Sequence, residues 1–259
     1  MARIIAVTSG KGGVGKTTVS ANLGIGLAGL HKKVVIVDMD LGLRNLDVAL
    51  GLETKVFYHL GDVLSGRVRV EEALVTSPDY PYLYLLAAPQ NLQSGLITEE
   101  AFRRLLTDLD KKCDFVLLDC PAGIGENFMH PIRMADEGLV VTSPVVSAVR
   151  DADKVLHLLE QVGVRRRYVL INDVRYELLM RGAMMNPKDI SEVLGTELIG
   201  VIPDDDEVIE CCNAGKPVEG THSPAGEAFT RISRRLNGET LEIPTGRKLF
   251  HRKKGLFRH

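Results

Sequence analysis

The residues of this chain that are best suited to chemistry form a glycine-rich segment near its beginning. Gly10 is followed at the fifth position by Gly15-Lys16-Thr17, which satisfies the pattern GxxxxGK[ST] directly after a short apolar run. Glycines of this kind let successive backbone N–H groups point at phosphate oxygens, and the start of a following helix attracts the same anion. The predicted phosphate-binding loop comprises Gly10, Lys11, Gly12, Gly13, Val14, Gly15, Lys16, Thr17 and Thr18.

Two side chains of this loop could act on a nucleotide. Lys16 would neutralise the β and γ phosphates, and the Thr17 hydroxyl would bind Mg²⁺, so ATP and Mg²⁺ are the predicted cofactors. The alternative is a glycine-rich turn that binds nothing. The complete motif between a strand and a helix favours the nucleotide.

Carboxylates follow two further apolar runs of strand length. Asp38 ends one run, Asp40 comes two positions later, and Asp119 ends the other. Doubly wound sheets bind ligands at the carboxyl ends of their strands, and a hydrated Mg²⁺ needs few carboxylates. We therefore predict Asp119 as a metal residue and expect Asp38 and Asp40 to point the same way, toward the phosphates or the metal. Taken alone, the pair could instead form a turn or cap a helix.

The elements that must position these residues alternate between apolar strands and longer amphipathic stretches. We predict strands at 4–7, 34–38, 83–87, 115–119, 138–142, 168–172 and 198–202, and helices at 17–30, 99–110, 148–162, 187–194 and 225–236. This order is typical of βαβ units. The predicted fold class is therefore α/β, a doubly wound, mostly parallel sheet with helices on both faces, of the P-loop NTPase type.

Composition limits the class of protein further. The chain has 259 residues, 45% hydrophobic and 25% charged, which is the balance of a globular protein with one sizeable core. No stretch approaches the ~20 apolar residues that span a bilayer, and the beginning lacks the pattern of a signal peptide. We therefore expect a cytoplasmic protein whose membrane contact is peripheral. Its four cysteines form no CxxC pair and are expected to be reduced.

The charge of the chain is unevenly distributed. Residues 1–246 hold 26 Lys/Arg against 34 Asp/Glu, whereas residues 247–259 hold six Lys/Arg and no acid. We predict an ATPase domain at 1–236, a linker at 237–246 and a basic amphipathic tail at 247–259. An acidic body makes DNA an unlikely partner.

The tail has the composition of an interfacial membrane anchor. As a helix it would place its apolar side chains on one face, with basic side chains around them, and such a segment binds anionic lipid. The predicted membrane residues are Leu249, Phe250, Lys253, Lys254, Leu256 and Phe257. One tail should bind weakly, and two tails on a dimer should bind more strongly. The alternative is a frayed, solvated terminus.

Lys11 adds a second lysine to the loop, and the segment KGGVGKT resembles the deviant Walker A, or ParA/MinD, family of ATPases, whose pattern is KGGxGKT. The resemblance implies a homodimer that forms on ATP binding, in which Lys11 reaches the partner's nucleotide. It also implies that Asp40 orients the attacking water and that Asp38 lies near Mg²⁺. For the base, it implies that Asn172 and the backbone around Pro203 read adenine. By this resemblance Lys11, Lys16 and Asp40 are the candidate catalytic residues.

Several longer segments resemble the division-site branch of that family. They are residues 38–47, 119–124, 147–153 and 200–204. This resemblance implies a membrane-associated switch on the cytoplasmic face of the cell membrane that helps to place the septum. Its implied partners are a division inhibitor (MinC-like) and a topological regulator (MinE-like or other).

Three other functions remain open on the sequence. A ParA-like plasmid or chromosome partition ATPase would share the nucleotide site and bind DNA through its folded body. A nitrogenase-reductase-like or iron–sulfur carrier P-loop protein would need cysteines placed to hold a cluster, and the adjacent pair Cys211-Cys212 does not match that need. A nucleotide-binding scaffold without turnover would keep the same residues.

Overall fold

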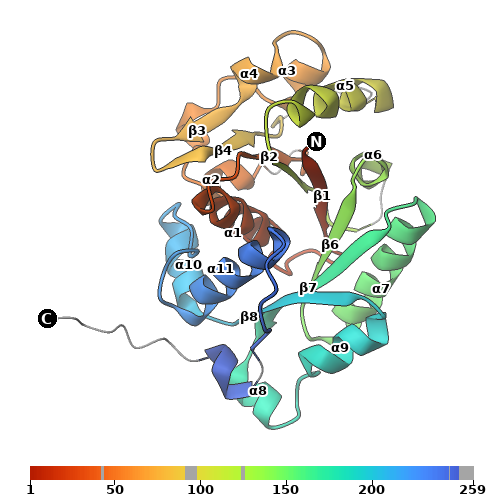
Figure 1. Ribbon diagram of the computed structural model, residues 1–259, viewed down its shortest axis with the longest axis vertical. Helices are drawn as coiled ribbons and strands as arrows, with labels where there is room; N and C mark the ends of the chain where they lie inside the picture. The colour runs from red at the N-terminus through yellow and green to blue at the C-terminus, as the bar shows by residue number, and fades with distance from the viewer. Residues whose placement is uncertain (42–43, 91–97, 124–125, 245, 251–259) are drawn as a thin grey trace, which may run out of the picture.

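A computed structural model of the chain describes residues 1–259 except 42–43, 91–97, 124–125, 245 and 251–259 (Figure 1). Its centre is a sheet of eight strands in the order β3-β4-β2-β5-β1-β6-β7-β8. The strands are β1 (Arg3–Thr8), β2 (Val34–Asp38), β3 (Val75–Ser77), β4 (Tyr80–Leu86), β5 (Phe115–Asp119), β6 (Glu137–Thr142), β7 (Arg166–Val174) and β8 (Glu197–Pro203). Every neighbouring pair is parallel except β3 and β4. The predicted doubly wound, mostly parallel sheet is confirmed.

Helices cover both faces of this sheet. The longer ones are α1 (Lys16–Gly29), α5 (Glu99–Asp110), α7 (Val146–Gln161), α9 (Pro187–Leu194) and α11 (Pro224–Leu236), close to the predicted ranges. The others are α2 (Leu46–Ala49), α3 (Leu60–Leu64), α4 (Val70–Ala73), α6 (Glu126–Arg133), α8 (Tyr176–Met180), α10 (Asp206–Asn213) and the 3₁₀ turns η1 (Glu53–Lys55) and η2 (Gly246–Phe250). The sequence patterns predicted none of this second group.

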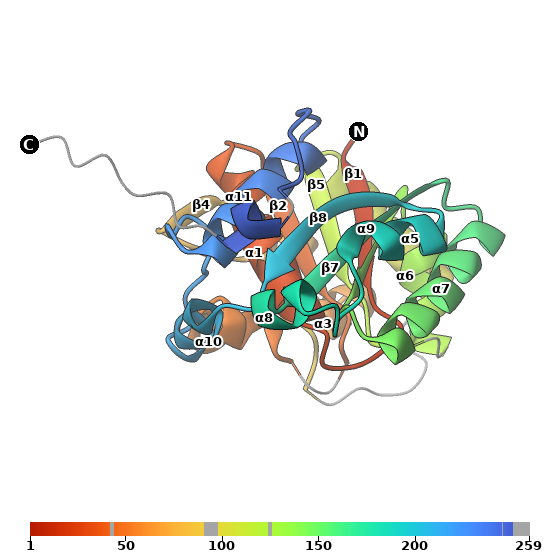
Figure 2. The same cartoon turned by 90° about the horizontal axis from the view of Figure 1, so that it is seen from below.

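The core is divided by the sheet into two layers. Alternate residues of β1 face opposite sides, so that Ala6 packs in one cluster with α5 and α7 while Ile5 and Val7 pack in the other with α1 and α11. Figures 1 and 2 show α1 and α11 side by side on one face and α5, α7 and α9 on the other. Strands covered on both faces explain the continuous Val/Ile/Leu runs in the sequence.

Asn22 fixes the helix that follows the glycine-rich loop. Its side chain is buried on α1, and its amide nitrogen donates to the Thr18 carbonyl at 2.8 Å. Its Oδ1 accepts from the backbone N–H groups of Val218 and Glu219, both at 2.8 Å. One buried side chain therefore ties α1 to the loop that precedes α11.

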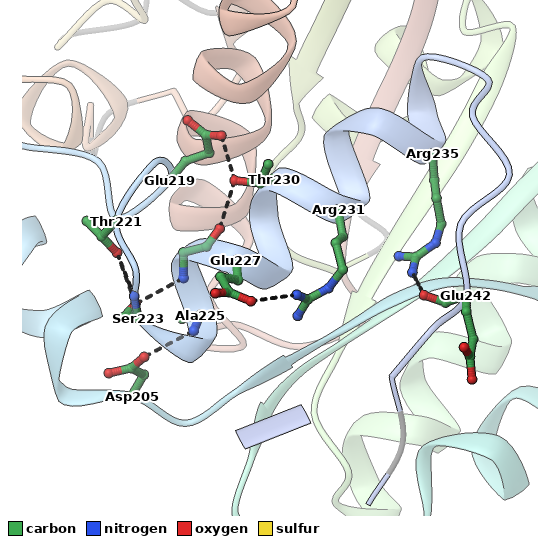
Figure 3. Close-up of polar contacts among 11 residues, drawn as sticks. Asp205, Glu219, Thr221, Ser223, Ala225, Glu227, Thr230, Arg231, Arg235 and Glu242 are labelled. Atoms are coloured by element: carbon green, nitrogen blue, oxygen red, sulfur yellow. Dashed lines mark hydrogen bonds and ion pairs between the residues drawn. The ribbon is translucent and has the colours of Figure 1, made fainter. Parts of the chain in front are cut away.

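The segment after α11 lies against the body of the protein. The Arg235 guanidinium donates to the carbonyl oxygens of Ile199 at 3.0 Å and Leu241 at 2.9 Å, and also to that of Glu242 (Figure 3). Burial lowers the pKa of this guanidinium from its usual value. A half-buried arginine therefore helps to hold part of the predicted linker in place.

The first residues of the predicted tail continue this contact. Leu249 is only 2% exposed and packs in the core cluster, and the Phe250 ring meets Tyr176 edge-on with centroids 5.0 Å apart. In this conformation both side chains face protein, and lipid contact by them stays a prediction that requires their release. Lys253, Lys254, Leu256 and Phe257 lie outside the described residues.

Candidate nucleotide-binding site

The glycine-rich loop connects the end of β1 to the start of α1. Gly13 and Gly15 have φ values of +79° and +86°, a region that side chains with a Cβ rarely adopt. Gly15 is the N-cap of α1, and no described side chain caps this helix start. The first N–H groups of α1 are therefore available to an anion.

Close packing also requires glycine at two positions of the loop. A Cβ on Gly10 would lie 2.3 Å from the backbone carbonyl carbon of Asp151 on α7. A Cβ on Gly15 would lie 2.3 Å from Nδ2 of Asn172 on β7. The glycine-rich loop is thus packed between α7 and β7, which fixes its conformation before any ligand binds.

Asp119 is the centre of a buried hydrogen-bond network at the end of β5. It is fully buried, and its Oδ1 accepts from Lys16 Nζ at 2.9 Å and Ser20 Oγ at 2.8 Å. Its Oδ2 accepts from Thr17 Oγ1 at 2.9 Å. The structure therefore brings together three residues that the sequence predicted at the phosphates and metal: Lys16, Thr17 and Asp119. Ser20 was missed, although it lies one helical turn after Lys16 and so shares its face.

Asp38 lies beside Asp119, since β2 and β5 pair in register at these two residues. It is 1% exposed, Oδ1 accepts from the Asp40 N–H at 2.9 Å, and Oδ2 is buried without a hydrogen-bond partner among the described residues. Burial, and then the neighbouring Asp119 charge, raise the pKa of Asp38 to about 7. An unpartnered buried oxygen next to a hydroxyl and a second carboxylate fits a Mg²⁺ ion with its waters.

The predicted adenine residues line one pocket of about 250 Å³ next to the loop. Asn172 donates from Nδ2 to the Val14 carbonyl at 2.9 Å, which fixes the orientation of its amide. Pro203 at the end of β8 also lines this pocket. The sequence did not predict the other residues that line the pocket, among them Val208 and Ile209 of α10 and Phe229 of α11.

The remaining predicted residues lie at the edge of the site. Lys11 is exposed and forms no ion pair with any residue in the described part of the chain, and Asp40 is half-buried. Arg175 pairs at 3.1 Å with Asp204, which lines the same pocket. Burial and the neighbouring Asp204 charge raise the pKa of Asp173 above its usual value. The position of Lys11 leaves it free to meet a second molecule.

The described residues were searched for membrane-spanning helices and for clusters of metal-binding side chains. None of their helices is both long and apolar enough to cross a lipid bilayer. Nor do they contain a cluster of three or more His, Cys, Asp or Glu side chains that could hold a metal ion.

Glycine loop, buried lysine and strand-end carboxylates together define a P-loop NTPase. The family model described as "NUBPL iron-transfer P-loop NTPase" (ParA) matches residues 1–237. The septum site-determining protein MinD of Synechocystis sp. is 45% identical over 243 residues, which cover 93% of this chain and 91% of that protein.

Solved structures agree with these sequence comparisons. The MinC:MinD cell division protein complex of Aquifex aeolicus matches with a TM-score of 0.88 and 41% identity, covering 95% of this chain and 99% of that one. MinD of Pyrococcus horikoshii in complex with Mg-ADP matches with a TM-score of 0.82 and 32% identity, covering 92% and 97%. The chain belongs to the MinD family of septum site-determining proteins.

Proposed function

We propose that this chain is an ATP-hydrolysing switch that helps to place the division septum by recruiting a division inhibitor to the membrane. The observation that carries the proposal is the Asp119 network beside a preformed glycine cradle. Relatives support it, because one MinD was solved with MinC and another with Mg-ADP.

Binding of ATP would begin at residues that are already in place. Lys16 is held at the start of α1 by its ion pair with Asp119, and its ammonium would turn from this carboxylate to the β and γ phosphates. Thr17, Asp38 and Asp119 would hold Mg²⁺ and its waters. That ion would neutralise charge on the phosphates. The purine would enter the pocket between Asn172 and Pro203.

Asp40 would orient the attacking water. Its own N–H donates to Asp38, so its backbone is fixed next to the metal residues while its side chain remains half-buried. The exposed Lys11 would supply a cation to the nucleotide of a partner subunit, stabilising charge on the transferring phosphoryl group. Dimerisation on ATP would thus complete each active site.

The chemical part of the proposal is tested by single-turnover hydrolysis of ATP with Mg²⁺. We expect Asp40→Ala to bind ATP as the unmodified chain does and to lose hydrolysis. Asp108→Ala, which removes an exposed carboxylate on α5, is the matched control and should change neither. Unchanged hydrolysis in Asp40→Ala would refute the water-orienting role. Absence of ATP binding in the unmodified chain would refute the proposal itself.

Recruitment to the membrane would depend on the tail. Each basic residue adds about 1 kcal/mol near an anionic surface, while ordering the backbone costs about 1–2 kcal/mol per residue. A dimer presents two tails and gains from their effective concentration, so attachment would follow the nucleotide. A partition ATPase would instead retain DNA on its folded body. Salt-sensitive DNA binding by a chain that ends at Phe250 would favour that function.

A further inference from the structure

Asp205 joins three parts of the chain just beyond β8, and its role is not explained by the nucleotide contacts above. It is the N-cap of α10, where its Oδ1 accepts from the Glu207 N–H at 3.2 Å. Its Oδ2 accepts from the Ala225 N–H at 3.0 Å, at the start of α11 (Figure 3). One carboxylate therefore bridges the loop after β8 and the beginnings of two helices.

The same three parts form one wall of the adenine pocket. Pro203 comes from the end of β8, Val208 and Ile209 come from α10, and Phe229 comes from α11. The rest of the lining, here called the other wall, includes Asn172 on β7 and the glycine loop between β1 and α1. The distance between the two walls thus depends on how α10 and α11 are held at the end of β8.

Electrostatics favour a carboxylate at this position. The start of each helix carries a partial positive charge, and an acidic side chain there is stabilising. Each oxygen of Asp205 accepts a backbone N–H group from the start of one helix, so the carboxylate holds α10 and α11 together. Asp205 itself lines the pocket, beside the residues that it holds. We propose that Asp205 is a positioning residue, which fixes the α10–α11 wall and so sets the affinity for the purine. This inference rests on the proposed ATP binding.

Ser223 offers a matched control because it caps the same helix without making the bridge. It is the N-cap of α11, it is buried, and its Oγ accepts from the Gly226 N–H at 3.0 Å. A change to alanine removes a cap from α11 but leaves the Asp205 carboxylate in place. If Asp205 were merely a helix cap, the two alanine variants should have the same consequences.

The experiment compares ATP with inorganic tripolyphosphate, which lacks the base, by calorimetric titration in the presence of Mg²⁺. We expect Asp205→Ala to weaken ATP binding about tenfold, which is about 1.4 kcal/mol, and to leave tripolyphosphate binding within about twofold. Asp205→Asn keeps one acceptor and should recover part of the loss. Ser223→Ala should lower Tm while leaving the ratio of the two affinities unchanged.

Several results would overturn the inference. They are unchanged ATP affinity in Asp205→Ala, equal loss of both ligands, or the same selective loss in Ser223→Ala. If Asp205→Ala does not fold, Asp205→Asn decides the matter on the same ratio. Failure of the unmodified chain to bind either ligand would instead refute the proposed function, together with this inference.

Discussion

Removal of the Asp119 charge should destabilise the nucleotide-free protein strongly. In Asp119→Asn the side chain keeps its size, but the buried Lys16 ammonium loses its charged partner at 2.9 Å. Lys16 is 7% exposed and Asp119 is fully buried, so water cannot replace the carboxylate without movement of α1. The amide can also no longer accept from all three donors, Lys16, Thr17 and Ser20.

The magnitude follows from two opposing effects. Breaking a buried ion pair by removing one partner costs about 3–5 kcal/mol. Part of this cost should be offset by Asp38, because its raised pKa depends in part on the charge of Asp119. With Asp119 neutral, Asp38 ionises more readily, and its charge would then attract the Lys16 ammonium. We therefore expect a net loss of about 2–3 kcal/mol in the free energy of unfolding.

Urea denaturation followed by circular dichroism at pH 7.5, without nucleotide or Mg²⁺, measures this loss. Glu100→Gln is the control, because it breaks an exposed ion pair. Glu100 and Arg104 also lie 2.9 Å apart, but their side chains are 79% and 73% exposed. Such a surface pair contributes about 0–1 kcal/mol. If Asp119→Asn costs no more than Glu100→Gln, the buried pair does not stabilise the nucleotide-free protein.

Three further predictions concern pH, the loop and α1. Because the folded pKa of Asp38 is about 7, above its usual 3.8, the stability due to its neutral form is fully present below about pH 4 and is lost as pH rises toward 7. Urea titrations between pH 4 and 8 should show this fall in the free energy of unfolding, and Asp38→Asn should flatten it. The same slope in Asp38→Asn would show that another group causes the fall. Gly15→Ala should lower the free energy of unfolding by about 1–3 kcal/mol and weaken ATP binding. Gly12→Ala should fold normally, because a Cβ there meets open space. Equal melting temperatures for the two variants would contradict this prediction. Asn22→Ala should cost about 2–4 kcal/mol in thermal or urea unfolding, because two backbone N–H groups lose their acceptor, and a loss below about 0.5 kcal/mol would show that water replaces it.

Much of the fold could be predicted because its strands and main helices are long and periodic. The antiparallel β3 was missed, since it has three residues and one of its polar side chains is exposed. Helices of four or five residues, such as α2 and α8, are too short to show a 3.6-residue period. The helix α6 was missed for another reason, because Pro131 in its interior argues against a helix.

The site was predictable where a motif fixes both residue type and spacing. Lys16, Thr17 and Asp119 follow from the loop and from the apolar strand that ends in a carboxylate, and the structure places them in contact. Asp205 could not be found in this way, because its importance lies in a contact with Ala225, twenty residues later. Nor could the sequence predict the burial of Leu249, since an apolar side chain in a basic segment can pack on protein as well as on lipid.

We propose that the nucleotide state controls attachment to an anionic membrane. Sedimentation of the intact chain with anionic vesicles, in Mg²⁺ with either ATP or ADP, tests it most directly. We predict that ATP brings much more protein into the pellet than ADP, that Asp40→Ala remains bound for longer in ATP, and that a chain ending at Phe250 stays in the supernatant. Equal binding in ATP and ADP, or equal binding after removal of residues 251–259, would show that the nucleotide or the tail does not control attachment.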